Sequence, residues 1–303
     1  MLPKKTAKFE AYTACAGAYC AVWRTGLGIL IIAVSYGGGT YLLGILAIKI
    51  AESIQLGAGY AMVFELATSS SKRAVLIALF SAVLMLPGLW LALKTVHHRS
   101  LRSVIAPTGR VHWGNYMRAV LFVALFAGGS SLPVLINAEF TQQLGLGQWL
   151  PWLAPALLLI FLQTATEELV FRGYLMQQLA ARFHSRWVWW VLPAMLFGAL
   201  HYNPLIYTDN TWLVVASAVL SGLIFGDITA RSGDLSIALG LHFANNLTVI
   251  LLLGVPGQLS SLSFYLQKLN VRDVDVMRLE ILTSAGIMLA VYFVYLLVMR
   301  GRR

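Results

Sequence analysis

Two adjacent glutamates and an arginine interrupt an apolar part of this chain. Glu167, Glu168 and Arg172 follow residues 157–162, which carry no charge, and the apolar character resumes in residues 173–176. In a membrane protein each such charge costs roughly 3 kcal/mol or more, so it needs a partner. Glu168 and Arg172 are four positions apart and can pair on one helix face. Glu167 is turned by about 100° from Glu168, which leaves it free for chemistry.

Two histidines and an asparagine follow at helical spacings. His201 ends an apolar stretch, and His242 and Asn246 are four positions apart, so they share one helix face. A glutamate with a histidine can bind a water molecule and take its proton. A second histidine and an asparagine amide can donate hydrogen bonds to a developing oxyanion. These are the parts for attack by water on a peptide carbonyl, and no serine or cysteine is obviously placed as a covalent nucleophile.

Each of these residues also has a purely structural interpretation. A membrane histidine such as His201 can serve as an interhelical hydrogen-bonding group, and so can His242 with Asn246. Their coincidence with two glutamates in neighbouring apolar segments favours a site. Four other histidines lie in basic or interfacial stretches, where we expect them to be solvated: His97, His98, His112 and His184.

Two further patterns indicate helix packing. Asp227 and Arg231 are four positions apart near the end of an apolar stretch, and we interpret them as a pair at a helix end. Gly222 and Gly226 have the GxxxG spacing that lets membrane helices approach closely.

The composition predicts the elements that must position these residues. Of 303 residues, 59% are hydrophobic and only 11% are charged, against about 25% charged in soluble domains. The apolar residues come in blocks of about 20, enough to cross a bilayer as helices, and they lack the alternation of a membrane barrel. We therefore expect an all-α, polytopic transmembrane bundle with the catalytic cavity inside it. The two cysteines, Cys15 and Cys20, have no partner pair for a zinc site.

About eight membrane spans are expected. Pro87 predicts a kink in the second, Pro151 and Pro155 are expected to mark the start of the fourth, and residues 51–73 are expected to form an outer loop or an interfacial helix. The expected spans are 26–46, 74–93, 119–138, one within 149–182, 187–201, 211–230, 235–253 and 281–299. We divide the chain into N-terminal spans and a basic loop (1–148), catalytic helices (149–254), and a polar loop with the last span (255–303).

The net charge of +10 is explained by the loops rather than by nucleic acid. The N-terminal tail, the 94–118 loop, the 172–186 region, Arg231 and the C-terminal tail hold 16 of the 22 Lys and Arg residues. Positive charge collects on the cytoplasmic side of membrane proteins. We therefore expect an integral protein of the bacterial inner membrane with both termini in the cytoplasm, and no nucleic-acid partner.

Three motifs in order resemble those of a known family. They are EExxxR at Glu167–Arg172, FxxxH at Phe197–His201 and HxxxN at His242–Asn246. Over about residues 150–253 the sequence resembles the CPBP intramembrane proteases. This family includes the type II CAAX prenyl endopeptidases and bacterial relatives linked to bacteriocin processing and self-immunity.

The resemblance implies a glutamate-dependent intramembrane endopeptidase acting on a membrane-associated or lipidated peptide within the bilayer. By motif position, Glu167 is the expected general base and His201 its partner on the catalytic water. His242 and Asn246 are the expected oxyanion donors, and Glu168 and Arg172 have supporting roles. The family was earlier regarded as metal-dependent, and one carboxylate with two histidines could bind zinc. We expect no cofactor, because the chain has no HExxH and an asparagine suits oxyanion binding, but a zinc-dependent protease stays open.

Two other functional classes also stay open. A non-catalytic membrane scaffold or bacteriocin-immunity protein could keep the same fold. A proton-coupled transporter could use the intramembrane acids. A Glu167→Gln variant that kept the wild-type phenotype would favour the scaffold. Substrate flux without peptide cleavage would favour the transporter.

Overall fold

The computed structural model describes residues 5–136, 140–257, 259–271 and 273–300. Five of its helices are long and apolar enough to cross a membrane, and two shorter apolar helices cover 187–199 and 236–252. The predicted polytopic all-α class is confirmed. The five long segments are Val22–Ile54, Lys72–Thr95, Leu146–Arg182, Pro204–Ser232 and Val274–Val298. The expected third span falls on a further helix, Trp113–Ile136, and its positions 137 and 138 lie outside the described residues.

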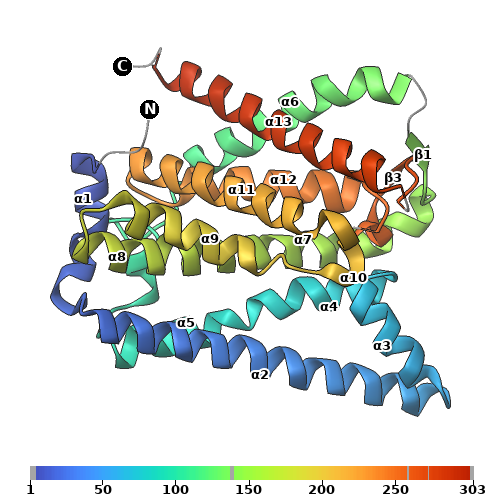
Figure 1. The fold of residues 1–303 in the computed structure, drawn as a ribbon, viewed down its shortest axis with the longest axis horizontal. Coiled ribbons are helices and arrows are strands. Elements are labelled where there is room, and N and C mark those ends of the chain that lie inside the picture. Colours follow the sequence, from blue (N-terminus) through green and yellow to red (C-terminus); the bar gives the residue numbers. More distant parts are fainter. Residues whose placement is uncertain (1–4, 137–139, 258, 272, 301–303) are drawn as a thin grey trace.

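The α-helices follow one another in a layered bundle (Figure 1). α7 and α9 lie between the N-terminal helices α2, α4 and α5 on one side and α11 and α12 on the other, with α6 and α13 beyond. The helices are α1 (Ala7–Thr13), α2 (Val22–Ile54), α3 (Ala58–Thr68), α4 (Lys72–Val83), α5 (Met85–Thr95), α6 (Trp113–Ile136), α7 (Leu146–Glu168), α8 (Met176–Arg182), α9 (Leu192–Ala199), α10 (Pro204–Tyr207), α11 (Thr211–Ser232), α12 (Ser236–Leu247) and α13 (Val274–Arg300).

Three short strands that the sequence did not predict form a small sheet. Strand β3 (Tyr265–Gln267) lies between β1 (Phe140–Gln142), to which it is antiparallel, and β2 (Leu253–Gly254), to which it is parallel. In the first pair, Thr141 is opposite Leu266. The sheet ties the segment after α6 to the segment before α13.

The region between the first two spans is helical but short. α3 has 11 residues, well below the roughly 20 that a span needs, so residues 51–73 add no crossing. Its C-cap, Ser69, is left-handed, and the next helix begins with Ser71 as its N-cap, whose side chain accepts from the amide of Ala74.

The prolines act in two ways. Pro87 has no N–H for the carbonyl of Val83, and the helix breaks there, between α4 and α5, as expected. At this break the Ser35 hydroxyl donates to the neighbouring carbonyl of Leu84 at 2.7 Å. Pro151 and Pro155, by contrast, lie inside α7, which begins at Leu146. The prediction that they mark the helix start is therefore wrong, because a membrane helix tolerates prolines beyond its first turn.

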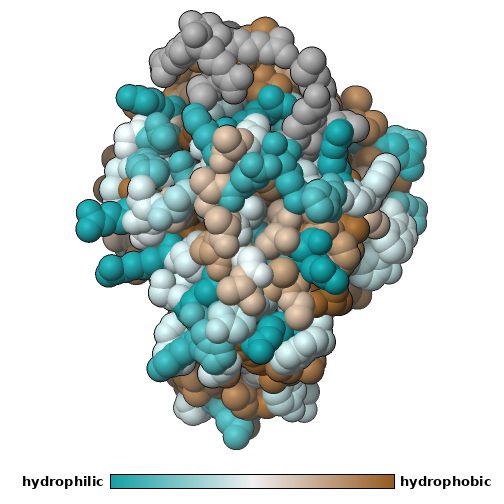
Figure 2. Space-filling view, turned by 90° about the vertical axis from the view of Figure 1, so that its left-hand side faces the viewer, coloured by the Kyte–Doolittle hydropathy of each residue, from teal (hydrophilic) through white to brown (hydrophobic). Residues whose placement is uncertain are grey.

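The N-terminal segment is packed into the bundle rather than being a free tail. Phe9 and Tyr12 of α1 are buried in the main cluster of apolar side chains, together with Leu89 of α5. Lys5 donates to the carbonyls of Ala180 and Phe183, at the end of α8. Figure 2 shows this end of the molecule, where hydrophilic side chains are spread between apolar ones.

His97 is buried at the same end, which corrects the expectation that it is solvated. Its Nε2 lies 2.8 Å from the Tyr174 hydroxyl and its Nδ1 lies 3.2 Å from the carbonyl of Tyr19. Burial lowers the pKa of His97 to about 4, so the side chain is neutral at pH 7. The Gln178 amide nitrogen lies 3.1 Å from Nδ1 of His97, so the ring is enclosed by residues of η1 (Ala14–Tyr19), of the segment after α7, and of α8.

Candidate active site

The EExxxR motif lies where the helix widens. α7 ends at Glu168 and continues as a π-helical segment, Leu169–Leu175, before α8. Such segments are often found at functional sites. A side chain at Gly173 would meet the carbonyl oxygen of Val104 at 2.8 Å, so glycine allows this segment to touch the loop after α5.

Glu168 is the hub of a buried charge cluster. Its Oε1 accepts from Arg172 Nη1 at 2.9 Å and from His242 Nδ1 at 2.9 Å. Glu168 is 0% exposed, Arg172 2% and His242 5%. The pairing of Glu168 with Arg172 that the spacing predicted is therefore present. The contact from Glu168 to His242 was not predicted.

The contact with Glu168 determines which ring nitrogen of His242 carries a hydrogen. An ionised carboxylate only accepts hydrogen bonds, so Nδ1 of His242 carries a hydrogen. Nε2 then faces Glu167 Oε2, 3.6 Å away, and this oxygen is buried without a hydrogen-bond partner. Two acceptors would repel one another there, so the pair is suited to hold one proton or a water molecule between them. With His242 protonated, the charges of Glu167, Glu168, Arg172 and His242 sum to zero.

Aromatic rings cover the charge cluster. Phe225 of α11 stacks on the His242 ring at 5.2 Å and 29°, and Phe197 of α9 meets the same ring edge-on at 6.0 Å. The Arg172 guanidinium carbon lies 4.4 Å from the centre of the Phe197 ring and 5.5 Å from that of Phe225. These cation–π contacts stabilise a buried cation. They also keep the surroundings of Glu168 apolar, which strengthens its interactions.

His201 lies just beyond the end of α9. Its Nδ1 is 3.0 Å from the carbonyl of Phe197, one turn earlier in the same helix, and its ring contacts the Phe197 ring at 4.9 Å. The described residues show no direct bond between His201 and Glu167. Phe197 contacts both His201 and His242, so His201 lies at the rim of the cluster, and its Nε2 is the nitrogen that can face a water. Its partnership with Glu167 stays a prediction.

Asn246 is held by a residue that the sequence interpretation missed. Its Nδ2 donates to Oε1 of Gln163 at 2.9 Å. Gln163 lies on α7 four positions before Glu167 and is only 8% exposed. The signal was present in the sequence, because an amide directly follows the apolar residues 157–162, one helical turn before the glutamates.

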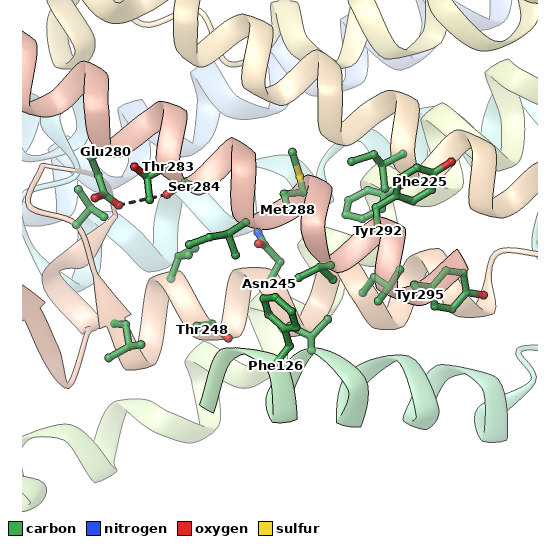
Figure 3. A pocket seen from close by; sticks show the side chains of 18 of the residues that line it. Phe126, Phe225, Asn245, Thr248, Glu280, Thr283, Ser284, Met288, Tyr292 and Tyr295 are labelled. Atoms are coloured by element: carbon green, nitrogen blue, oxygen red, sulfur yellow. Dashed lines mark hydrogen bonds between the residues drawn. The ribbon is translucent and has the colours of Figure 1, made fainter. Parts of the chain in front are cut away.

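A cavity of about 380 Å³ lies beside the cluster, between α6, α11, α12 and α13. Phe225 and Asn245 both line it (Figure 3). Phe225 stacks on His242 from this side, and Asn245 donates to Asn246 Oδ1 at 3.2 Å. The cavity has a largely apolar lining, with Glu280 and Ser284 bonded to each other near one part of it.

The donor set does not favour a metal ion. Among the described residues, no group of three or more His, Cys, Asp or Glu side chains is arranged to hold one. Nδ1 of His242 is engaged by Glu168, and the same carboxylate oxygen is engaged by Arg172. The nearest donors still available are Glu167 Oε2 and His242 Nε2.

A known family model covers the segment that carries these residues. Residues 148–248 match the family model "Type II CAAX prenyl endopeptidase Rce1-like". The chain carries an Rce1-like domain. The match includes the EExxxR motif at the end of α7, His201 just after α9, and His242 and Asn246 of α12. It supports a CAAX-type intramembrane protease as the general class of the protein.

Outside the Rce1-like domain the comparisons say less. The chain is 26% identical over 233 residues to the uncharacterized protein YyaK of Bacillus subtilis (strain 168), which covers 75% of this chain and 76% of YyaK. No solved structure matches the present chain significantly. The match to YyaK extends beyond the Rce1-like domain, but it brings no activity, substrate or partner.

Proposed function

We propose that the protein hydrolyses a peptide bond of a membrane-associated or lipidated substrate, with Glu167 as the general base. The observation that carries the proposal is the buried cluster in which Glu168, held by Arg172, orients His242 toward Glu167. A lone carboxylate beside an oriented imidazole, inside an Rce1-like domain, is suited to activating water.

The proposed reaction needs no covalent intermediate. Glu167 takes a proton from a water that His201 helps to hold, and the oxygen of that water bonds to the carbonyl carbon. The carbonyl oxygen becomes an oxyanion, stabilised by Asn246 Nδ2 and by Nε2–H of protonated His242. When the carbon–nitrogen bond breaks, Glu167 returns its proton to the leaving amine. Glu168 and Arg172 support His242 and do not touch the substrate.

The cellular setting belongs to the same proposal. An integral protein of the bacterial inner membrane with both termini in the cytoplasm fits the distribution of basic residues. We propose no cofactor for the reaction. Activity of the purified protein in a strong chelator tests this point, and loss of activity that zinc restores would favour the zinc-dependent alternative.

The decisive experiment compares membrane peptides and lipoproteins from cells that make the wild type or Glu167→Gln. We expect cleavage products in the wild type that fall about 10²–10⁴-fold in the variant, as on loss of a general base. Glu10→Gln, at an exposed glutamate of α1, is the matched control and should cleave normally. Undiminished cleavage in both Glu167→Gln and His201→Ala would exclude this mechanism.

A further inference from the structure

Three amide side chains form a continuous chain beside the charge cluster. Asn245 Nδ2 donates to Asn246 Oδ1 at 3.2 Å, and Asn246 Nδ2 donates to Gln163 Oε1 at 2.9 Å. One end of the chain, Asn245, lines the 380 Å³ cavity (Figure 3). The other end, Gln163, is buried in α7, one turn before Glu167.

The direction of this chain determines what Asn246 can do. An asparagine side chain has one acceptor oxygen and one NH₂ group with two donors. With its oxygen engaged by Asn245 and one N–H by Gln163, Asn246 keeps its second N–H for a substrate oxygen. In the reversed chain the Oδ1 and Nδ2 positions of Asn246 are exchanged, and an oxygen stands where the donor is needed.

We infer that Gln163 and Asn245 are positioning residues that hold the Asn246 amide in its donating orientation. Gln163 acts as an acceptor and Asn245 as a donor. The inference rests on the proposed function, in which Asn246 stabilises the oxyanion. It adds a requirement that the three motifs do not specify, because Gln163 lies before EExxxR and Asn245 occupies an unspecified position of HxxxN.

Exchange of each amide for a carboxylate separates the two directions, because a carboxylate can only accept. Gln163→Glu keeps the acceptor that Asn246 uses, whereas Asn245→Asp removes the donor and draws the Asn246 NH₂ group toward itself. The full-length protein in detergent is assayed with a quenched fluorescent transmembrane peptide that the wild type cleaves and Glu167→Gln does not. Gln163→Leu removes the acceptor, and Gln55→Leu, at the exposed end of α2, is the matched control.

We expect Gln163→Leu and Asn245→Asp to lower kcat by about 10–100-fold with little change in KM, as when an oxyanion donor is misplaced. Gln163→Glu should restore most of the kcat that Gln163→Leu loses. The opposite pattern, with Gln163→Glu impaired and Asn245→Asp active, would overturn the inference. Equal activity of all three variants would overturn it as well, as would equal losses accompanied by equal falls in unfolding temperature.

A substitution of Asn246 itself separates the proposed oxyanion role of this residue from the inferred orientation of its amide. If Asn246→Ala keeps its kcat, the oxyanion role fails. The orientation is then judged by the unfolding temperature alone. The inferred direction still requires Gln163→Glu to unfold at a higher temperature than Gln163→Leu. It also requires Asn245→Asp to unfold below the wild type, because turning the Asn246 NH₂ group toward the new carboxylate breaks its bond to Gln163.

Discussion

Glu168 is the residue on which the charges of the site converge. One of its oxygens accepts from both Arg172 and His242, and all three side chains are nearly inaccessible to solvent. Removing one member leaves an unpaired charge in an apolar environment, which is costly. The same hydrogen bonds therefore stabilise this region and orient His242.

Replacing Arg172 tests this coupling. Arg172→Met leaves Glu168 buried without its cation, so we expect a loss of about 3–5 kcal/mol in the free energy of unfolding. Unfolding of the purified protein in detergent measures it. Arg278→Met removes an exposed pair with Asp275 and should cost about 0–1 kcal/mol. Equal losses in the two variants would contradict the buried cluster.

The sequence predicts this residue scale only in part. The pairing of Glu168 with Arg172 follows from helical spacing within one element, and so it was predictable. The bond from Glu168 to His242 depends on how α7 and α12 are rotated about their axes, which no local pattern specifies. The burial of His97 is not predicted for a similar reason, because it depends on Tyr19 and on Tyr174, which are 78 and 77 positions away.

At the scale of elements, small residues bring α9 and α11 into contact. A side chain at Gly222 of α11 would meet the Ala194 Cα of α9 at 2.9 Å, and one at Gly198 would meet the Val215 carbonyl of α11 at 2.9 Å. The prediction that the GxxxG glycine Gly222 permits close packing is confirmed. Because α9 also carries Phe197 and leads to His201, this contact sets how near that histidine lies to the cluster.

Gly222→Ala should separate the two helices. The new methyl group meets backbone rather than a flexible side chain, so α9 must shift, and displacement of a catalytic group by about 1 Å can cost about 10²-fold in rate. We expect lower peptide cleavage and a lower unfolding temperature in the same assays. Gly44→Ala in α2, where a side chain would meet nothing within 4 Å, should leave both unchanged or slightly raise stability. A Gly222→Ala protein as active and stable as Gly44→Ala would exclude tight contact.

The sequence predicts the helices, whose positions depend on hydrophobicity, better than the strands, which depend on pairing between distant segments. The expected spans fall on apolar helices because a bilayer requires about 20 apolar residues for each crossing. The strands are not predictable from local sequence, because β1 and β3 are only three residues long. Their paired residues Thr141 and Leu266 are 125 positions apart in the chain. The π-helical segment at Leu169–Leu175 shows no local signal that the motif analysis could use.

At the scale of the whole molecule, segments expected on one side of the membrane meet at one end. Thr6 donates to the carbonyl of Ala230 in α11, Tyr12 donates to that of Val104, and Tyr292 of α13 donates to Asp227. α1 and the C-terminal part of α13 lie at this same end (Figure 1). The division of the chain into three regions stays a prediction. In the structure, buried apolar side chains from α1 and α5 pack in one cluster with those of α9 and α12.

Thiol labelling of intact cells tests the orientation. With Cys20→Ser as background, the exposed Cys15 should react with a membrane-impermeant maleimide only after permeabilisation. A cysteine at the exposed Gln55, beyond the far end of α2, should react without it in a Cys15→Ser background. Labelling in the reverse order would place both termini outside the cytoplasm.

The docking of the N-terminal segment has a consequence for biosynthesis. Thr6 bonds to Ala230, 224 positions later in the chain, and Lys5 bonds to carbonyls at the end of α8. At roughly 5–20 residues per second, the ribosome takes about 11–45 s to supply Ala230 after Thr6. Lys5 and Thr6 therefore have no binding surface until α8 and α11 have been made, and α12, which carries His242 and Asn246, is translated only after that.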